Sequence, residues 1–445
     1  MGHSSLTDRV RSTQRLLRKN MLKSVLDQFD GQLMKLDEDK RRAKYSKMTA
    51  SPFLFYRGTA YLFYFDTSRE WLPYHSAPER PTWIQGDLHF ENFGAFRSES
   101  GRIVFDVNDF DEGYLGSYLY DVLRMAVSVS LISRMMGLET EAEGEAIKQY
   151  AEAYYRQIQR FAKRKEDPCD LVFDEEHTDG PIRKLLRKVQ KRSTSDFLEE
   201  VTTLLPENRR FIRSAEIVAV TEEERARLLA AWPDYIGTIE PKTKRPDAHY
   251  GIKDLAVKHG SGTASIGLDR YYVLIEAEGG NQALDDVVLE VKEVRVPVPA
   301  YFMPYSETFW NYFGHQGKRV IVTQQAMHHE ADPYLGYLTI EDRHFYVRER
   351  SPYKKKLKVD KLDGAEELLA ALETMGQITA KMHARADVDV KEGLLDYHSE
   401  DEIYAAMGED RGAFAEFVAN WAMSYAYQVE EDYVLFKEWV EERSA

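Results

Sequence analysis

The spacing of apolar side chains predicts a mainly helical first part of the chain. Residues 11–48 carry apolar residues three and four positions apart among many Lys and Arg, which is typical of one or two amphipathic helices. Residues 118–136 are apolar on almost every face and predict a buried helix. Residues 139–165 predict a helix with one apolar face, and the basic stretch 183–192 also has a helical pattern. We therefore expect a helical lobe over residues 1–205.

The pattern changes near residue 205, where prolines interrupt it. They are Pro206, Pro233, Pro241 and Pro246, and with the charges scattered between them they predict a connector. Beyond it, short runs rich in Val, Ile and Tyr have the composition of strands. The predicted strands cover residues 254–258, 269–277, 286–294 and 344–350. Residues 206–350 are thus expected to form a β-rich lobe.

Helical periodicity returns within and after this lobe. Residues 307–330 predict one helix, residues 360–386 predict another with a single apolar stripe, and the aromatic stretch 411–442 predicts a third. The last two lie in residues 351–445, which we expect to complete the helical lobe. The predicted fold class is α+β with two lobes.

Composition limits the possible classes of protein. The chain has 445 residues, of which 43% are hydrophobic and 12% aromatic, so it is long and apolar enough to bury a large core. Its net charge of −15 argues against general nucleic-acid binding. The single cysteine, Cys169, excludes an internal disulfide and fits a reducing compartment. With no long apolar run, these features predict a soluble cytoplasmic protein that does not bind membranes.

Polar side chains cluster at the ends of two apolar stretches within residues 84–111. Asp87, His89 and Asn92 follow the first stretch, and Asp106, Asp109 and Asp111 lie at the end of the second. If the two stretches are neighbouring strands, these groups meet, and carboxylate and amide oxygens are the ligands that Mg²⁺ prefers. The simpler alternative is that Asp and Asn only punctuate a hairpin through hydrogen bonds to the backbone.

A glycine-rich segment gives a second chemical signal. It runs from Gly260 to Gly267, with Gly262 and Ser265 inside it, and Lys292 lies on the predicted strand after next. A dinucleotide-binding loop would open a helix, but this segment leads into a strand. Backbone N–H groups of a glycine hairpin can approach phosphates closely, and Lys292 can reach the same phosphates. The alternative is an ordinary turn and a lysine that faces solvent.

Two of these motifs resemble the small-molecule kinases. Gly86 to Asn92 resembles the catalytic loop of aminoglycoside phosphotransferases, and Asn108 to Asp111 resembles their metal-binding strand end. The resemblance implies that Asp87 orients a hydroxyl group, that Asn92 and Asp109 hold Mg²⁺ with Asp111 beside them, and that Asp121 braces the loop. It also implies that Gly260, Gly262, Ser265, Gly267 and Lys292 bind the phosphates of ATP.

More closely, the chain is identified as a member of DUF2252, a family of uncharacterised bacterial proteins. The matching motifs are Ser51–Gly58, Gly86–Gly94, Phe105–Glu112, Leu289–Glu293 and Phe345–Arg350. In ordinary kinases the lysine precedes the catalytic loop, but here Asp87 comes before Lys292. We therefore expect a circularly permuted kinase-like fold, which requires no change in how the elements pack. The helix expected after Lys292 has no obvious Glu to pair with it.

The predicted function is an ATP- and Mg²⁺-dependent phosphotransferase that acts on a small hydroxylated substrate. One alternative is the transfer of AMP to a protein, and another is a pseudokinase that binds nucleotide without turnover. A hydrolytic metal site would leave the glycine segment and Lys292 unexplained. The sequence identifies neither the acceptor nor the oligomeric state.

Overall fold

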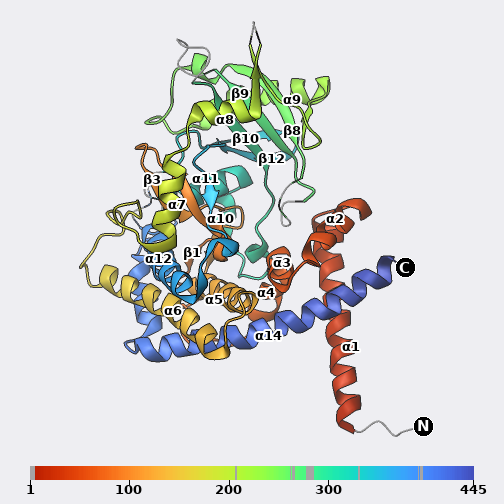
Figure 1. Ribbon diagram of the computed structural model, residues 1–445, viewed down its shortest axis with the longest axis vertical. Coiled ribbons are helices and arrows are strands. Elements are labelled where there is room, and N and C mark those ends of the chain that lie inside the picture. The colour runs from red at the N-terminus through yellow and green to blue at the C-terminus, as the bar shows by residue number, and fades with distance from the viewer. Residues whose placement is uncertain are drawn as a thin grey trace.

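The computed structural model is a mixed α+β protein in which a helical body lies below an antiparallel sheet (Figure 1). It describes residues 6–205, 208–260, 262, 266–276, 285–328, 331–388, 390 and 394–444. None of the helices described over these ranges is long and apolar enough to cross a lipid bilayer.

The helical body is built from the two ends of the chain. Its N-terminal helices are α1 (Leu6–Leu26), α2 (Glu38–Met48), α3 (Pro52–Gly58), α4 (Ala60–Thr67), α5 (Tyr118–Met135), α6 (Thr140–Ala162) and α7 (Gly180–Gln190). Its C-terminal helices are α12 (Gly364–Arg385), α13 (Ser399–Met407) and α14 (Arg411–Ser444). Helix α5 is buried on nearly every side, as its apolar sequence predicts. One hydrophobic core contains residues from both ends of the chain.

Helices α6 and α12 pack against each other along much of their length. Gly376 makes this close approach possible, because a Cβ atom at that position would lie 2.6 Å from the carbonyl oxygen of Tyr150. The apolar stripe predicted for residues 360–386 thus faces α6.

The upper part contains a six-stranded antiparallel sheet in the order β11-β12-β10-β9-β8-β7. Its strands are β7 (Ile217–Ala219), β8 (Ile252–Lys258), β9 (Arg270–Ile275), β10 (Val287–Glu293), β11 (Gly336–Ile340) and β12 (Arg343–Glu349). Helix α9 (Glu222–Thr238) covers one face through Leu228, Trp232 and Tyr235. The other face carries α8 (Thr194–Val201) and the hairpin of β5 (Thr202–Leu204) and β6 (Arg209–Phe211).

Two expectations from the sequence pattern are wrong in detail. The predicted connector contains α9, in which Pro233 is inside the helix. A capping box formed by Thr221 and Glu224 and the burial of Trp232 stabilise this helix despite the proline. The single helix predicted for residues 307–330 is divided into α10 (Glu307–Tyr312) and α11 (Gln316–Met327), because His315 caps a new helix start.

Two small sheets carry the polar motifs, and their pairing differs from the expected hairpin. Strand β1 (Thr82–Ile84), which precedes Asp87, pairs with β4 (Tyr114–Gly116). Strand β3 (Ile103–Val107), which precedes Asp109, pairs with β2 (Phe93–Arg97), and β2 also pairs with β13 (Lys355–Lys356). The two apolar stretches are therefore not paired with each other. The polar groups meet because the backbone N–H of Asn108 donates to the carbonyl oxygen of Asn92, at 2.8 Å.

Asp106 is not part of the expected cluster of polar side chains around Asp87 and Asp109. Its side chain lies on the opposite side of β3 from the candidate site and forms a buried ion pair with Lys381 of α12. The two residues are 4% and 2% exposed. This pair fixes β3 to the C-terminal half of the helical body.

We expect Lys381→Met to destabilise the protein by about 3–5 kcal/mol, because it leaves the Asp106 carboxylate buried without a partner. The matched control is Lys184→Met, which removes the ion pair of an exposed lysine with Glu367 and is expected to cost less than about 1 kcal/mol. Urea unfolding of the two variants and the wild type measures both costs. Equal losses in the two variants would contradict this account of Asp106.

Candidate active-site cleft

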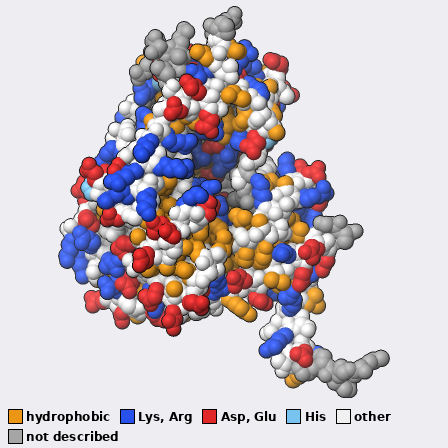
Figure 2. All heavy atoms as spheres, in the orientation of Figure 1, with side chains coloured by type: hydrophobic (Ala, Val, Ile, Leu, Met, Phe, Trp, Pro, Cys, Tyr) orange, Lys and Arg blue, Asp and Glu red, His pale blue; other side chains and the backbone are white. Residues whose placement is uncertain are grey.

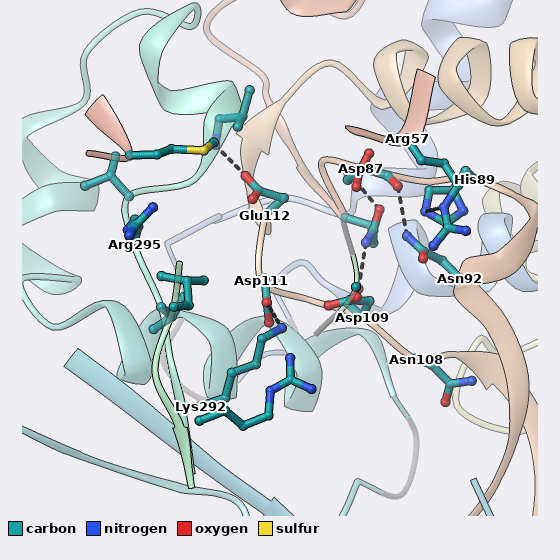
Figure 3. Close-up of a pocket in the computed structure, with 18 of the residues that line it drawn as sticks. Arg57, Asp87, His89, Asn92, Asn108, Asp109, Asp111, Glu112, Lys292 and Arg295 are labelled. Atoms are coloured by element: carbon teal, nitrogen blue, oxygen red, sulfur yellow. Dashed lines mark hydrogen bonds and ion pairs between the residues drawn. The ribbon is translucent and has the colours of Figure 1, made fainter. Parts of the chain in front are cut away.

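A cleft of about 280 Å³ lies between the sheet and the helical body. Figure 2 shows it as a hollow with Lys and Arg side chains along its rim and floor. The predicted residues Asp87, Asn92, Asp109, Asp111 and Lys292 all line it. In Figure 3 Asp109 lies between the loop that carries Asp87 and the pair formed by Asp111 and Lys292.

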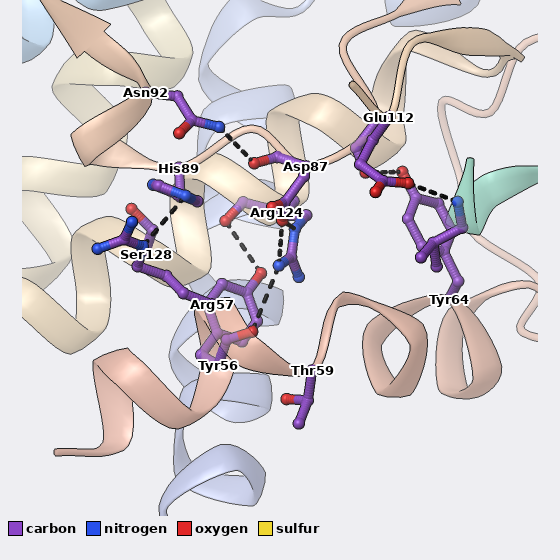
Figure 4. Close-up of polar contacts among 12 residues, drawn as sticks. Tyr56, Arg57, Thr59, Tyr64, Asp87, His89, Asn92, Glu112, Arg124 and Ser128 are labelled. Carbon is purple, nitrogen blue, oxygen red and sulfur yellow. Dashed lines mark hydrogen bonds and ion pairs between the residues drawn. The ribbon is translucent and has the colours of Figure 1, made fainter. Parts of the chain in front are cut away.

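Asp87 lies in the loop after β1, and Arg124 holds its carboxylate in place. Arg124, a fully buried residue of α5, donates from Nε to Asp87 Oδ1 at 2.7 Å and forms an ion pair with the same oxygen (Figure 4). The guanidinium lies 4.4 Å from the centre of the Tyr56 ring. Burial raises the pKa of Asp87, although Arg124 acts against this rise. No hydrogen bond to Asp87 Oδ2 occurs in the described part of the chain, so this oxygen is available to a ligand.

Asp121 holds the backbone of the same loop. Its carboxylate accepts hydrogen bonds from the N–H groups of Gln85 at 2.6 Å and Gly86 at 3.0 Å. His383 of α12 contacts the same carboxylate at 3.2 Å. Gly86 has a φ of +86°, and a Cβ atom there would lie 2.1 Å from the carbonyl oxygen of Glu112, so only glycine fits. The two ends of the chain thus act together on the loop.

Gln85 links the loop of Asp87 to the strand end of Asp109. Its side chain accepts from the N–H of Asp87 at 2.8 Å and donates to the carbonyl oxygen of Asp109 at 2.6 Å. The Asn92 amide donates to the carbonyl oxygen of Asp87 at 2.8 Å. No partner for Asn92 Oδ1 occurs among the described residues. The backbone therefore sets Asp87, Asn92 and Asp109 in fixed relative positions.

The chemistry of Asp109 fits a bound cation. Its Oδ1 atom is buried and has no hydrogen-bond partner among the described residues, which is costly for a carboxylate oxygen. Burial acts to raise the pKa of Asp109, but Lys292 and Arg348 outweigh it and lower the pKa to about 2. The group is therefore ionised at neutral pH. Asp109 and the free amide oxygen of Asn92 are the hard oxygen ligands that Mg²⁺ requires.

Lys292 has a carboxylate partner, but it comes from an unexpected element. The lysine on β10 is 4% exposed and forms an ion pair with Asp111 rather than with a residue of the helix that follows it. Tyr346 of β12 donates to the other oxygen of Asp111 at 2.8 Å. Both oxygens of Asp111 are thus engaged, so Asp111 is less accessible to a metal ion than Asp109 is.

A fully buried arginine of α11 supports this pair from behind. Arg319 donates to the carbonyl oxygens of Asp111 and Gly113, both at 2.7 Å, and of Arg295, at 3.1 Å. Burial lowers the pKa of Arg319 to about 10. We expected a helix after Lys292 to supply an acidic partner for this lysine. Helix α11 instead supplies Arg319, which binds backbone oxygens.

The glycine segment is only partly covered by the structure. Gly262 lines the cleft, whereas Gly260 and Gly267 are not among the lining residues, and Ser265 lies outside the described residues. Gly267 has a φ of +87°, and its carbonyl oxygen accepts a hydrogen bond from Arg295 at 3.2 Å. In sequence the segment lies between β8 and β9.

The sequence interpretation missed most of the positive charge in the cleft. The basic lining residues are Arg57, Arg270, Lys292, Arg295, Arg348, Lys354 and Lys356. The carboxylates are Asp87, Asp109, Asp111 and Glu112. Alternation is a usable signal for two of the missed lysines, since Lys354 and Lys356 are two positions apart in an extended segment and so share one face. Arg124 gave no signal, because it lies in an apolar helix.

One compact group of possible metal ligands occurs elsewhere in the described part of the chain. Asp387, His398 and Glu400 have ligand atoms within 4.8 Å of one another. Arg164 already donates to Glu400 at 3.0 Å, which supplies a positive charge to this group.

The fold and the cleft define a mixed α+β protein with a cationic site between a helical body and an antiparallel sheet. The family model described as "Uncharacterized protein conserved in bacteria (DUF2252)" matches residues 36–439, so the chain belongs to the DUF2252 family. Comparisons with curated proteins and with solved structures gave no match.

Glu112 gives the cleft a pH-dependent effect on stability. Burial raises its pKa from 4.5 to about 7, although the N–H of Val298 donates to its carboxylate. Below pH 4.5 the carboxyl is protonated in both the folded and unfolded states. Between pH 4.5 and 7 only the unfolded state ionises, so this contribution to stability is lost as the pH rises.

We expect Glu112→Gln to remove this loss. Between pH 4.5 and pH 8, its free energy of unfolding should rise by about 2 kcal/mol relative to that of the wild type. One pKa unit corresponds to about 1.4 kcal/mol, and solvent in the cleft reduces the full effect of the shift. Urea unfolding across this pH range measures it, with the exposed Glu145→Gln as control. Parallel stability curves for Glu112→Gln and the wild type would refute the assignment.

Proposed function

We propose that the protein is an ATP- and Mg²⁺-dependent phosphotransferase that acts on a hydroxylated acceptor. The observation that carries the proposal is the cleft itself, where Lys292 and its partner Asp111 face Asp87, Asn92 and Asp109. Phosphoryl transfer needs little more than positioning and charge neutralisation, and these residues are suited to both.

The order of elements in the sheet supports a kinase-like upper lobe. Counted from β8, the glycine segment joins the first and second strands, Lys292 lies on the third, and α11 follows it. In protein kinases a glycine-rich loop covers the phosphates and the lysine is also on the third strand. The extra strand β7 pairs with β8 at the edge of the sheet.

The contacts at the end of α12 favour a circular permutation. The segment after α12 reaches back to the start of β1, where the Tyr397 hydroxyl donates to the carbonyl oxygen of Pro81 at 2.5 Å. Helix α12 also holds the loop through His383 and Asp121. In the proposed permutation, α12 is the helix that would lead into the catalytic loop in an unpermuted chain.

In this proposal Asp87 accepts a hydrogen bond from the acceptor hydroxyl through Oδ2 and takes its proton as the hydroxyl oxygen attacks the γ-phosphorus. The bond from this phosphorus to the β,γ-bridging oxygen breaks, and ADP leaves. The raised pKa of Asp87 makes it a better base than an exposed carboxylate. Asn92 and Asp109 would hold Mg²⁺, which when bound offsets the charge of the phosphates. Lys292 would release Asp111 in part and donate to the α- and β-phosphates.

We expect Asp87→Asn to lower the turnover of ATP by about 10² to 10⁴-fold with little change in ATP affinity, because it removes the base and leaves the phosphate contacts intact. Release of ADP in the presence of a pool of small hydroxylated compounds measures turnover. The control is Asp39→Asn, whose side chain is 92% exposed, and it should match the wild type. An Asp87→Asn protein as fast as the wild type would exclude the role given to Asp87.

The products distinguish phosphoryl transfer from AMP transfer. We expect ADP and a phosphorylated acceptor, because Asp87 and Asp109 face the end of the cleft assigned to the γ-phosphate. Phosphorus NMR of the reaction separates ADP from pyrophosphate. Formation of pyrophosphate with an adenylylated product would replace the proposal by AMP transfer to a protein.

A further inference from the structure

Three basic residues of the cleft have no ion-pair partner among the described residues. They are Arg295, Lys354 and Lys356. Each of the other cations has an ion-pair partner: Lys292 pairs with Asp111, Arg57 pairs with Glu91, and Arg270 and Arg348 share Glu290. Uncompensated cations in a partly buried cleft are unfavourable unless an anion binds there.

The three residues divide between the two sides of the cleft. Arg295 lies at the end of β10 and donates to Gly267, so it belongs to the glycine segment and to the side proposed for the nucleotide. Lys354 and Lys356 belong to the helical body, since β13 pairs with β2 and places Lys356 opposite Gly94. Lys354 donates to the carbonyl oxygen of Asn108 at 3.3 Å. Lys356 is therefore on the side of Asp87 and Asn92, and Lys354 lies between that side and Arg348 of β12.

Lys355 faces away from the cleft, although it lies between the two lysines in sequence. Burial and the nearby Lys188 and Arg192 lower its pKa, so its neighbours are the basic residues around α7. Strand alternation explains the difference between Lys355 and its two neighbours. The chain thus provides a matched control for a charge inside the cleft.

Arg57 and His89 extend the cationic wall beside Asp87. Arg57 is oriented by its ion pair with Glu91 and donates from Nε to His89 Nε2 at 3.2 Å. Burial, then Arg57 and Lys356, lower the pKa of His89 well below its usual range, so the ring is neutral. Because Nε2 accepts, Nδ1 carries the proton. This buried donor has no partner in the described part of the chain, and His89 lines the cleft.

We propose that the acceptor is itself a phosphate monoester, and that Lys354, Lys356 and Arg57 bind its phosphate while Asp87 receives its hydroxyl group. This assignment rests on the proposed phosphotransferase function and specifies its substrate class. Arg57 is oriented by Glu91, and Lys354 and Lys356 have no carboxylate partner among the described residues. A phosphate monoester offers three strong acceptor oxygens, one for each of these three side chains, whereas a carboxylate offers two.

The position of the two lysines relative to Asp109 also fits this arrangement. Both line the same cleft as Asp109, and Lys354 donates to the carbonyl oxygen of the residue before it, Asn108. A phosphate on the acceptor would place its hydroxyl group within reach of Asp87 and hold it there.

Calorimetry with inorganic phosphate as the probe tests the assignment. The protein is first titrated with the non-hydrolysable β,γ-methylene analogue of ATP in the presence of Mg²⁺, which fills the positions of all three nucleotide phosphates. Phosphate is then titrated into this complex, and acetate is titrated in parallel. We expect phosphate to bind, Lys356→Met to weaken it about tenfold or more, and Lys355→Met to leave it unchanged.

The outcomes test separately whether the variant is folded, whether the lysines bind the acceptor, and whether the cleft binds nucleotide. Binding of the analogue to Lys356→Met shows that the variant is folded. If the analogue binds the wild type but abolishes phosphate binding, these lysines serve the nucleotide and the acceptor assignment is wrong. Equal losses in the two lysine variants, or acetate binding as tight as phosphate, would also overturn it. If the analogue does not bind the wild type, the proposed phosphotransferase fails and the acceptor assignment fails with it.

Discussion

Lys292 and Asp111 come from opposite sides of the cleft, and their ion pair links the sheet to the helical body. Tyr346 engages the second oxygen of Asp111, and Arg319 binds the backbone oxygen of the same residue at 2.7 Å. Burying these charges is costly, and an apolar pair of similar volume would stabilise the fold at least as well. Stability alone therefore does not explain the pair. In the proposed function, a phosphate group would exchange with Asp111 for the lysine.

The position of the loop around Asp87 depends on contacts from distant parts of the chain. Asp121 of α5 holds its backbone, His383 of α12 contacts Asp121, and Arg124 fixes the Asp87 carboxylate. The buried pair of Asp106 and Lys381 ties β3 to α12 in the same way. Both ends of the chain thus help to position the Asp87 carboxylate. Helix α12 supports the candidate site in this way, although none of its residues lines the cleft.

Local patterns predicted the helices better than they predicted the pairing of strands. Helices α5, α6, α12 and α14 follow from apolar periodicity, because each buries one face or all of its faces. Strand partners are set by contacts far apart in sequence, so the expected pairing of the stretches before Asp87 and Asp109 was wrong. Pro233 misled the prediction of a connector, since packing and a capping box outweigh its cost in α9.

The residues of the candidate site could be predicted from the sequence, but their ion-pair partners and the positive charge of the cleft could not. The sequence identified Asp87, Asn92, Asp109, Asp111 and Lys292, and all five line one cleft. It did not identify the partner of Lys292, because Asp111 was expected beside the metal ion and an acid was sought on the next helix. The cationic lining was also missed, because the net charge of −15 describes the whole surface and not one cleft.

The central claim is that this cleft binds ATP together with a divalent cation, and calorimetric titration of ATP tests it most directly. The account predicts binding that is strengthened by Mg²⁺ in the wild type, and an Asp109→Asn variant in which Mg²⁺ no longer has this effect. Failure of ATP to bind, or binding of equal strength with and without Mg²⁺, would contradict it.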